Sequence, residues 1–412
     1  MNQRLARSAI HRLLTSVREG QVRLLEDGET RVLGTQGGKP PLAATVTVND
    51  PSFHAQMLRG SLGLGESYMD GIWDADDLVS LIRIAARNAH RFDNVRRRLR
   101  PVIGPLQHVA GVLRRNTIAR SRDQIAAHYD LGNGLYELFL DETMMYSAAV
   151  FNGPDTPLLE AQLAKLDRIC RKLDLQPGDR LLEIGSGWGA MACYAAEHYG
   201  ARVTTTTISR EQHALATQRV REAGLEDRVT VLLEDYRNLT GTYDKLVSVE
   251  MIEAVGWRDF GTFFEVCGER LEDDGVMLLQ AITIDDRAYD VEKATRSFIN
   301  QLIFPGGCLP SMEVISRCTS RNTDMRIVQL EDITSHYVTT LRHWRERFLA
   351  QTDALDGRGY DARFRRLWEL YLAYCEAGFA ERRIQDVQVL LAKPGYRAEP
   401  LWDRPSVVAV AA

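Results

Sequence analysis

The spacing of apolar residues changes along the chain, and from about residue 160 it alternates between two periods. Short apolar runs predict strands, and the segments between them have the 3.6-residue period of amphipathic helices. The expected strands are 180–185, 202–208, 229–235, 245–250 and 275–283. The expected helices are 158–173, 190–200, 210–224 and 258–271. Strands separated by helices of this length predict an α/β fold with a doubly wound, mostly parallel sheet.

The N-terminal part has a different pattern and predicts a smaller α+β domain. A helix is expected over 4–17, strands over 22–25 and 44–48, and an apolar helix over 78–86. With 412 residues, the chain exceeds the ~100–200 residues of a typical domain, which favours two domains. The predicted division is an N-terminal lipid-binding or membrane-binding domain at 1–82, a basic linker at 83–122, the α/β domain at 123–400 and a tail at 401–412.

Residues 83–122 contain eleven arginines and one acid, Asp93, with apolar residues interleaved. A solvated linker explains this composition, and so does a basic amphipathic surface for anionic lipid headgroups. An RNA-binding arm fits less well, because no aromatic stacking residues accompany the arginines. The net charge of −5 excludes a globally basic nucleic-acid binder.

The six cysteines form no CxxC pair, so neither a metal site built on cysteines nor a redox motif is indicated, and no metal is expected. Reduced thiols suit a cytoplasmic protein. The N-terminus lacks a secretory signal, and no apolar run reaches the ~18 residues needed to span a bilayer. A cytoplasmic protein that meets the inner face of the membrane from its surface is therefore expected.

A glycine-rich turn follows the first strand of the α/β part and predicts a nucleotide site. It reads Glu183, Ile184, Gly185, Ser186, Gly187. Glycines there permit a tight turn and close approach of the backbone to a ligand. The GxGxG spacing, the acid two residues before the first glycine, and the absence of an acid after the second strand favour S-adenosylmethionine over a dinucleotide.

The next two strand ends carry further candidates. Thr207 and Ile208 lie at the end of the second strand, with Gln212 after it, and Asp235 and Tyr236 lie at the end of the third. Asp235 suits the exocyclic amine of adenine, and Tyr236 suits its face. The alternative for Asp235 is a cap on the next segment.

Five separated motifs together resemble the cyclopropane-fatty-acyl-phospholipid synthase family. They are HYDLGNGLYELFLDETMMYSAAVF (128–151), LLEIGSGWG (181–189), TISREQ (207–212), SVEMIEAVG (248–256) and FPGGCLPS (304–311). The resemblance implies a class I methyltransferase that acts on a double bond of an unsaturated acyl chain in phospholipid. It also implies a homo-oligomer. The residues expected to bind S-adenosylmethionine are Tyr146, Ser147, Glu183, Gly185, Ser186, Gly187, Thr207, Ile208, Gln212, Asp235 and Tyr236.

The resemblance implies an active site with Glu253 and Tyr337, and a bound bicarbonate as the base. Two of the positions that would hold bicarbonate differ here, because alanine and glutamine occupy 148 and 280. Glu142 precedes TMMYS where many members have proline. This combination is similar to a subgroup that makes 10-methylene or 10-methyl acyl chains with a protein carboxylate as base. Catalytic candidates are therefore Glu142, Glu253, Tyr337 and Gln280, with Glu250 as a competitor.

The chemistry requires a dry pocket, because methyl transfer to an alkene leaves a carbocation that water would quench. Direct proton loss from the new methyl group gives a cyclopropane, whereas a prior hydride shift gives a methylene, which a separate reductase could reduce. Burial and proximity to Glu142 are expected to raise the pKa of Glu253. Two other functions stay open: a methyltransferase for a soluble metabolite, and a non-catalytic protein that binds S-adenosylmethionine or lipid.

Overall fold

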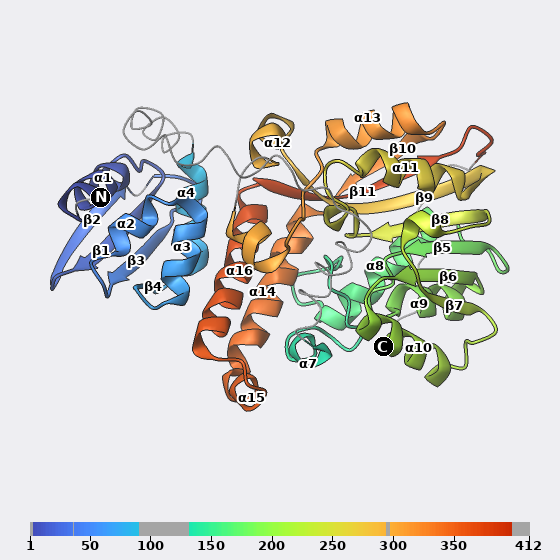
Figure 1. The fold of residues 1–412 in the computed structure, drawn as a ribbon, viewed down its shortest axis with the longest axis horizontal. Helices are drawn as coiled ribbons and strands as arrows, with labels where there is room; N and C mark the ends of the chain where they lie inside the picture. The colour runs from blue at the N-terminus through green and yellow to red at the C-terminus, as the bar shows by residue number, and fades with distance from the viewer. Residues whose placement is uncertain (1–2, 36, 90–131, 294–296, 398–412) are drawn as a thin grey trace. The chain divides into compact units, whose positions relative to one another are not determined.

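The computed structural model describes residues 3–35, 37–89, 132–293 and 297–397, and these form two units, each with its own sheet (Figure 1). The first unit contains the described residues up to 89 together with 297–303 and 341–383. The second contains the rest. The division is thus less simple than the predicted sequence boundaries, because two later segments join the N-terminal residues.

The first unit is built on a four-stranded sheet in the order β2-β1-β3-β4. Its strands are β1 (Gly20–Glu26), β2 (Glu29–Thr35), β3 (Ala43–Val48) and β4 (Trp73–Ala75). β1 pairs antiparallel with β2 and parallel with β3. The helices are α1 (Gln3–Thr15), α2 (Phe53–Met57), α3 (Gly60–Met69), α4 (Leu78–Arg87), the π-helix η3 (Ile299–Ile303), α15 (Thr352–Gly357) and α16 (Ala362–Ala380).

The sequence predicted α1, β1, β3 and α4, but it missed α3. Two glycines of α3, Gly63 and Gly65, are buried, and a Cβ on Gly65 would lie 3.2 Å from the Cβ of Phe298. Glycine thus permits close packing, although it lowers the helix propensity. The segment therefore lacks the amphipathic pattern from which a helix is predicted.

The predicted basic linker begins inside a helix, which corrects its boundary. Arg83 and Arg87 belong to α4, and their Nε atoms both donate to the Glu381 carboxylate, at 2.7 and 2.8 Å. These two arginines therefore serve packing within the first unit. The remaining arginines of the segment lie outside the described residues.

The second unit has the predicted α/β fold, with a seven-stranded sheet in the order β10-β11-β9-β8-β5-β6-β7. Its strands are β5 (Arg180–Ile184), β6 (Arg202–Thr207), β7 (Val229–Leu233), β8 (Tyr243–Val249), β9 (Leu271–Ile284), β10 (Arg326–Asp332) and β11 (Ile384–Ala392). The five from β5 to β9 are parallel, and β11 and β10 add an antiparallel pair beyond β9.

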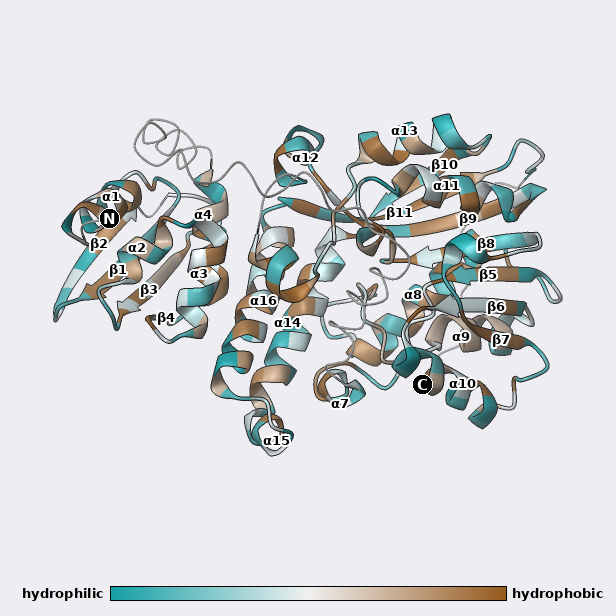
Figure 2. Ribbon diagram, in the orientation of Figure 1, coloured by the Kyte–Doolittle hydropathy of each residue, from teal (hydrophilic) through white to brown (hydrophobic). Residues whose placement is uncertain are grey.

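The helices of this unit alternate with the strands along the chain. They are α7 (Asn133–Tyr136), α8 (Leu158–Lys172), α9 (Ala190–Tyr199), α10 (Arg210–Glu222), η1 (Tyr236–Asn238), η2 (Ile252–Ala254), α11 (Phe260–Glu269), α12 (Asp286–Glu292), α13 (Met312–Asn322) and α14 (Thr334–Ala350), whose residues from 341 belong to the first unit. Two apolar clusters line the sheet, one including α11 and α13 and the other α8 and α9. Figure 2 shows the contrast between hydrophobic β9 and hydrophilic α10.

The strand order creates a crevice at the carboxyl ends of the parallel strands. From β5 the chain passes outward to β6 and β7 and then returns to β8 on the other side of β5. Ligands of such sheets bind where the order reverses. Among the described residues, no helix is both long and apolar enough to cross a membrane.

Candidate functional site

A cavity lies at this reversal point, and the ends of β5, β6, β7 and β8 form its walls. All eleven residues predicted to bind S-adenosylmethionine line it. The other lining residues are Met144, Met145, Ile184, Trp188, Thr206, Glu234, Arg237, Val249, Glu250, Met251, Ala254 and Val255. The lining is thus polar at the strand ends and apolar around the methionine side chains.

The glycine turn after β5 shapes the wall through its backbone. Gly185 has a φ of +99° and Gly187 one of +48°, both in the region that favours glycine. A Cβ on Gly185 would lie 3.0 Å from Cγ of Met251. The N–H groups of Gly185 and Ser186 both donate to the Thr206 carbonyl, so the turn is tied to β6.

Glu183 is a buried carboxyl in this wall. Its Oε2 accepts a hydrogen bond of 2.5 Å from the Thr205 hydroxyl. Burial raises the pKa of Glu183 to about 8, against the opposing effects of that bond and of Lys165. An ammonium group bound beside Glu183 would favour its charged form. This residue therefore fits the cationic amino-acid end of S-adenosylmethionine.

The strand ends of β6 and β7 are already organised by side-chain contacts. The Thr207 hydroxyl donates to Oε1 of Gln212 at 2.9 Å. Asp235 receives two hydrogen bonds of 2.8 Å from the Arg237 guanidinium and caps η1 through the Arg237 N–H. The alternative reading of Asp235 as a cap is therefore confirmed, and its contact with adenine stays a prediction. Tyr236 packs edge-on against Phe263.

Glu250, which was expected only as a competitor of Glu253, lies at the centre of a hydrogen-bond network at one side of the cavity. It comes directly after β8 and lines the cavity. Its Oε1 accepts from the Ala148 N–H at 2.9 Å and from Nε2 of Gln280 at 2.8 Å. The Tyr337 hydroxyl donates to its Oε2 at 2.7 Å. Three groups from separate parts of the chain thus converge on one carboxylate.

The pKa of Glu250 is raised, although several contacts oppose the increase. Burial raises its pKa, while the bonds from Tyr337, Ala148 and Gln280 and the nearby Lys165 charge lower it. Lys165 is itself fully buried in α8 and donates to the Ser147 hydroxyl at 2.7 Å. Burial lowers the pKa of Lys165 to about 8, although surrounding acids, first Glu250, oppose this shift.

Glu253 lies on η2 beside this network but is not part of the cavity lining. Its Oε1 accepts from the Ile282 N–H at 2.6 Å. Its Oε2 is buried and has no hydrogen-bond partner within the described part of the chain. Burial, reinforced by the charge of Glu250, raises the pKa of Glu253 to about 8, in the expected direction.

Gln280 connects the cavity to a polar chain inside the sheet. Its Nε2 also lies 3.2 Å from Oδ2 of Asp386, and its Oε1 accepts from Gln388 at 3.0 Å. Asp386 is fully buried on β11, and burial followed by repulsion from Glu250 raises its pKa.

Glu142 is not brought to the cavity. Its side chain is exposed and absent from the lining, and its backbone carbonyl accepts from Nη2 of Arg219 at 2.9 Å. A base must lie within hydrogen-bond reach of the proton that it removes, so this placement does not support the predicted role of Glu142. Of the four catalytic candidates, Gln280 and Tyr337 contact Glu250 directly, and Glu253 lies nearby.

Comparison with known proteins shows the family to which the chain belongs. The family model described as "Mycolic acid cyclopropane synthetase" matches residues 116–389. The chain belongs to this family. Family relatives include the tuberculostearic acid methyltransferase UfaA1 of Mycobacterium tuberculosis, which is 40% identical over 87% of this chain and 86% of its own. The cyclopropane-fatty-acyl-phospholipid synthase of Escherichia coli is 38% identical over 85% and 88%, respectively.

Solved structures of the family agree with the fold of the α/β unit. Cyclopropane synthase MmaA2 from Mycobacterium tuberculosis has a TM-score of 0.62 and 31% identity, covering 66% of this chain and 98% of that one. Mycolic acid cyclopropane synthase CmaA1, complexed with SAH and CTAB, has a TM-score of 0.61 and 33% identity over the same shares. The protein is accordingly a class I S-adenosylmethionine-dependent methyltransferase.

Lys165 and Asp386 were not among the residues predicted from the sequence, and Glu250 was predicted only as a competitor of Glu253. A usable signal existed only for Glu250. It follows β8 directly, and the rule that selected residues at the ends of β5, β6 and β7 applies equally there. Lys165 and Asp386 lie within a helix and a strand, where nothing in the local pattern distinguishes them from exposed polar residues.

Proposed function

We propose that this protein methylates a double-bond carbon of an unsaturated fatty acyl chain in phospholipid, and that Glu250 removes the proton that completes the reaction. The observation that carries the proposal is a single cavity whose wall contains both the glycine turn and a carboxylate held by three hydrogen bonds. The substrate class is taken from the names of the relatives, which act on fatty acids and fatty-acyl phospholipids.

The backbone of Glu250 supports a functional role for its side chain. Its φ is +47°, in the left-handed region that L side chains adopt at a cost of ~1–3 kcal/mol. A glycine would avoid that cost. A charged side chain kept at such a position, and placed in a cavity wall, is explained by a requirement for the carboxylate.

S-Adenosylmethionine, when bound, supplies an electrophilic methyl group. We assign its amino-acid end to Glu183 and the turn from Gly185 to Gly187. Tyr146, Ser147, Thr207, Ile208, Gln212, Asp235 and Tyr236 complete the proposed binding set.

Methylation of an alkene leaves a cationic acyl chain, which must lose one proton. Glu250 can take that proton on Oε2, the oxygen that also accepts from Tyr337. A base works best when its pKa lies near the operating pH, and burial moves Glu250 in that direction. The apolar side chains Met144, Met145 and Met251 in the same wall would exclude water from the cation.

We propose a methylene product, with cyclopropane as the second candidate. Ala148 and Gln280, which occupy the two positions that differ from the bicarbonate-binding pattern, both donate hydrogen bonds to Glu250, and this supports a protein carboxylate as the base. Bicarbonate is then not needed as the base. The E. coli relative, at 38% identity, keeps cyclopropane as an alternative. A methylene product would require a separate reductase to become a methyl branch.

The test uses vesicles of oleoyl phospholipid and methyl-labelled S-adenosylmethionine. After the reaction, the acyl chains are released and analysed by mass spectrometry with and without ozonolysis. A labelled chain that ozone cleaves at the new carbon is the expected result, whereas a labelled chain resistant there would indicate cyclopropane. Label only on soluble molecules would reject the lipid substrate, and no transfer would favour a non-catalytic role.

Membrane association is proposed through the basic segment, most of which lies outside the described residues. If arginines make the contact, vesicle binding should weaken with added salt, because exposed charges are screened. Salt-independent binding to anionic vesicles would point to apolar insertion instead.

A further inference from the structure

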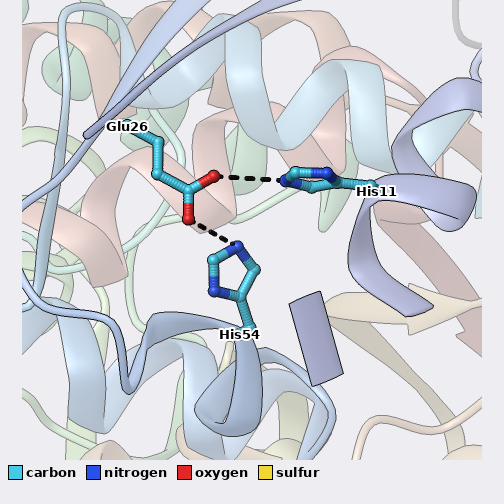
Figure 3. A group of neighbouring side chains, drawn as sticks. All are labelled: His11, Glu26 and His54. Carbon is cyan, nitrogen blue, oxygen red and sulfur yellow. Dashed lines mark hydrogen bonds and ion pairs between the residues drawn. The ribbon is translucent and has the colours of Figure 1, made fainter. Parts of the chain in front are cut away.

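The first unit contains a cluster of two histidines and one carboxylate that the methyltransferase reaction does not use. His11 lies on α1, Glu26 ends β1 and His54 lies on α2 (Figure 3). Nε2 of His11 is 3.2 Å from Oε2 of Glu26, and Nε2 of His54 is 3.2 Å from Oε1. The side chains of His54 and Glu26 are only 3% and 8% exposed. Two rings therefore face the two oxygens of one buried carboxylate.

The hydrogen bonding of His54 places a ring lone pair, and not an N–H group, opposite the Glu26 carboxylate. The ring bonds to the backbone of Pro51, and since proline has no N–H, the ring nitrogen must donate to its carbonyl. A neutral ring that donates from one nitrogen presents a lone pair on the other, and Nε2 has no hydrogen-bond partner among the described residues. That lone pair faces a carboxylate oxygen.

The distances suit a small divalent cation between the three groups. Tetrahedral zinc with bonds of ~2.0–2.1 Å to nitrogen and oxygen has ligand atoms ~3.3–3.4 Å apart. Here each ring nitrogen lies 3.2 Å from a different oxygen of Glu26, and one ligand atom from each of the three residues lies within 4.8 Å of the other two, so a small shift of the side chains brings them to that spacing. The bond from His54 to Pro51 is of the kind that orients metal-binding histidines.

Two arginines contact side chains of this cluster and would compete with a cation for them, but each arginine also has an acidic partner outside the cluster. Nη2 of Arg7 is 3.1 Å from Glu26 and also 2.9 Å from Asp27. Nη1 of Arg31 is 3.3 Å from Nδ1 of His11, and its Nη2 bonds to the exposed Glu29 at 3.2 Å. Both guanidinium groups are partly exposed and can keep those acidic partners when a cation occupies the cluster.

We propose that His11, Glu26 and His54 bind a divalent transition-metal ion, with Zn²⁺ the best fit, and that this ion ties α1 and α2 to β1. Imidazole and carboxylate ligands suit zinc, and three protein ligands leave one position for water. The adjoining cavity, which Glu26 and His54 line together with Asn49 and Asp50, provides room for that water. This proposal is independent of the methyltransferase site.

The test uses the full chain, dialysed against a chelator and then titrated with Co²⁺ alone, followed by competition with Zn²⁺. One Co²⁺ per chain should bind with d–d absorption bands and without a thiolate charge-transfer band, which would signal the cysteines. His11→Asn and His54→Gln should each lower affinity by more than about tenfold. The matched control is His198→Asn, which changes a partly exposed histidine in the other unit and should bind as the original does.

Absence of metal binding to the original protein would overturn the proposal and leave a protonated ion pair as the explanation of the cluster. Equal binding by the original, His11→Asn and His54→Gln would overturn it as well. If neither histidine variant folds, Arg31→Gln decides the question. Removing that competing guanidinium from His11 should tighten Co²⁺ binding, and unchanged affinity would contradict the site.

Discussion

The cavity has a wall proposed to bind the cofactor and a side proposed to accept the proton, and these two parts are encoded differently in the sequence. The wall is made of residues that directly follow β5, β6 and β7, together with Tyr146 and Ser147. The proton-accepting side gathers Ala148, Gln280 and Tyr337 around Glu250, from a loop, a strand and a helix. The first is local in sequence, whereas the second exists only in the folded unit. Residues that bind the cofactor can therefore be predicted from the sequence more easily than residues that would remove the proton.

The strongest test of this difference is Glu250→Gln. The amide keeps the size of the side chain but cannot accept the proton, so turnover should fall by about 10²–10⁴-fold, as expected for loss of a general base. Affinity for S-adenosylmethionine should stay nearly unchanged, as measured by calorimetry. Full activity in this variant would remove Glu250 from the role of base.

The cofactor wall is tested by Gly185→Ala. A Cβ there meets Met251 at 3.0 Å and imposes a φ of +99° on alanine, so cofactor affinity should fall about tenfold to a hundredfold. Gly178→Ala is the matched control, because its φ is +91° but its Cβ would have no neighbour within 4 Å. Equal loss of cofactor affinity in both variants would mean that strain, and not the cavity wall, is responsible.

The raised pKa of Glu253 predicts that the stability of the protein depends on pH. Its folded pKa of about 8 lies above the model-peptide value, so the folded state binds more protons than the unfolded state between about pH 4.5 and 8. Its contribution to the free energy of unfolding should fall across this window by up to ~1.4 kcal/mol per pH unit and then level off. Urea denaturation of the original and Glu253→Gln should show a difference that grows with pH. A constant difference would show that Glu253 is ionised throughout.

The smallest effect is expected for Glu142→Gln. Because this side chain is exposed and outside the cavity lining, turnover should change by less than about twofold. A loss as large as that of Glu250→Gln would show that Glu142 reaches the reacting acyl chain, and would restore the role that the sequence suggested.

The parallel sheet was predictable because its strands are short runs of apolar or β-branched residues that alternate with segments of helical period. The antiparallel strands β10 and β11 were not assigned, and α3 was hidden by its buried glycines. Within the site, the strand-end residues followed from topology alone. The pairing of Gln280 with both Glu250 and Asp386 depends on the register of β9 against β11, which a single sequence does not specify.

The proposed metal cluster could not be predicted from the sequence either. The spacing of cysteines argued against a metal site, but His11, Glu26 and His54 lie on three separate elements and form no sequence motif. Their convergence depends on how α1 and α2 pack against β1, which only the folded unit determines.

The most direct test of the central claim follows the three hydrogens of the transferred methyl group. The protein is incubated with S-adenosylmethionine carrying a CD₃ methyl and with oleoyl phospholipid vesicles, and the released acyl chains are weighed. We expect a new carbon that retains two deuterium atoms, because the carboxylate removes the third. A new carbon that retains all three, or acyl chains of unchanged mass, would contradict the central claim.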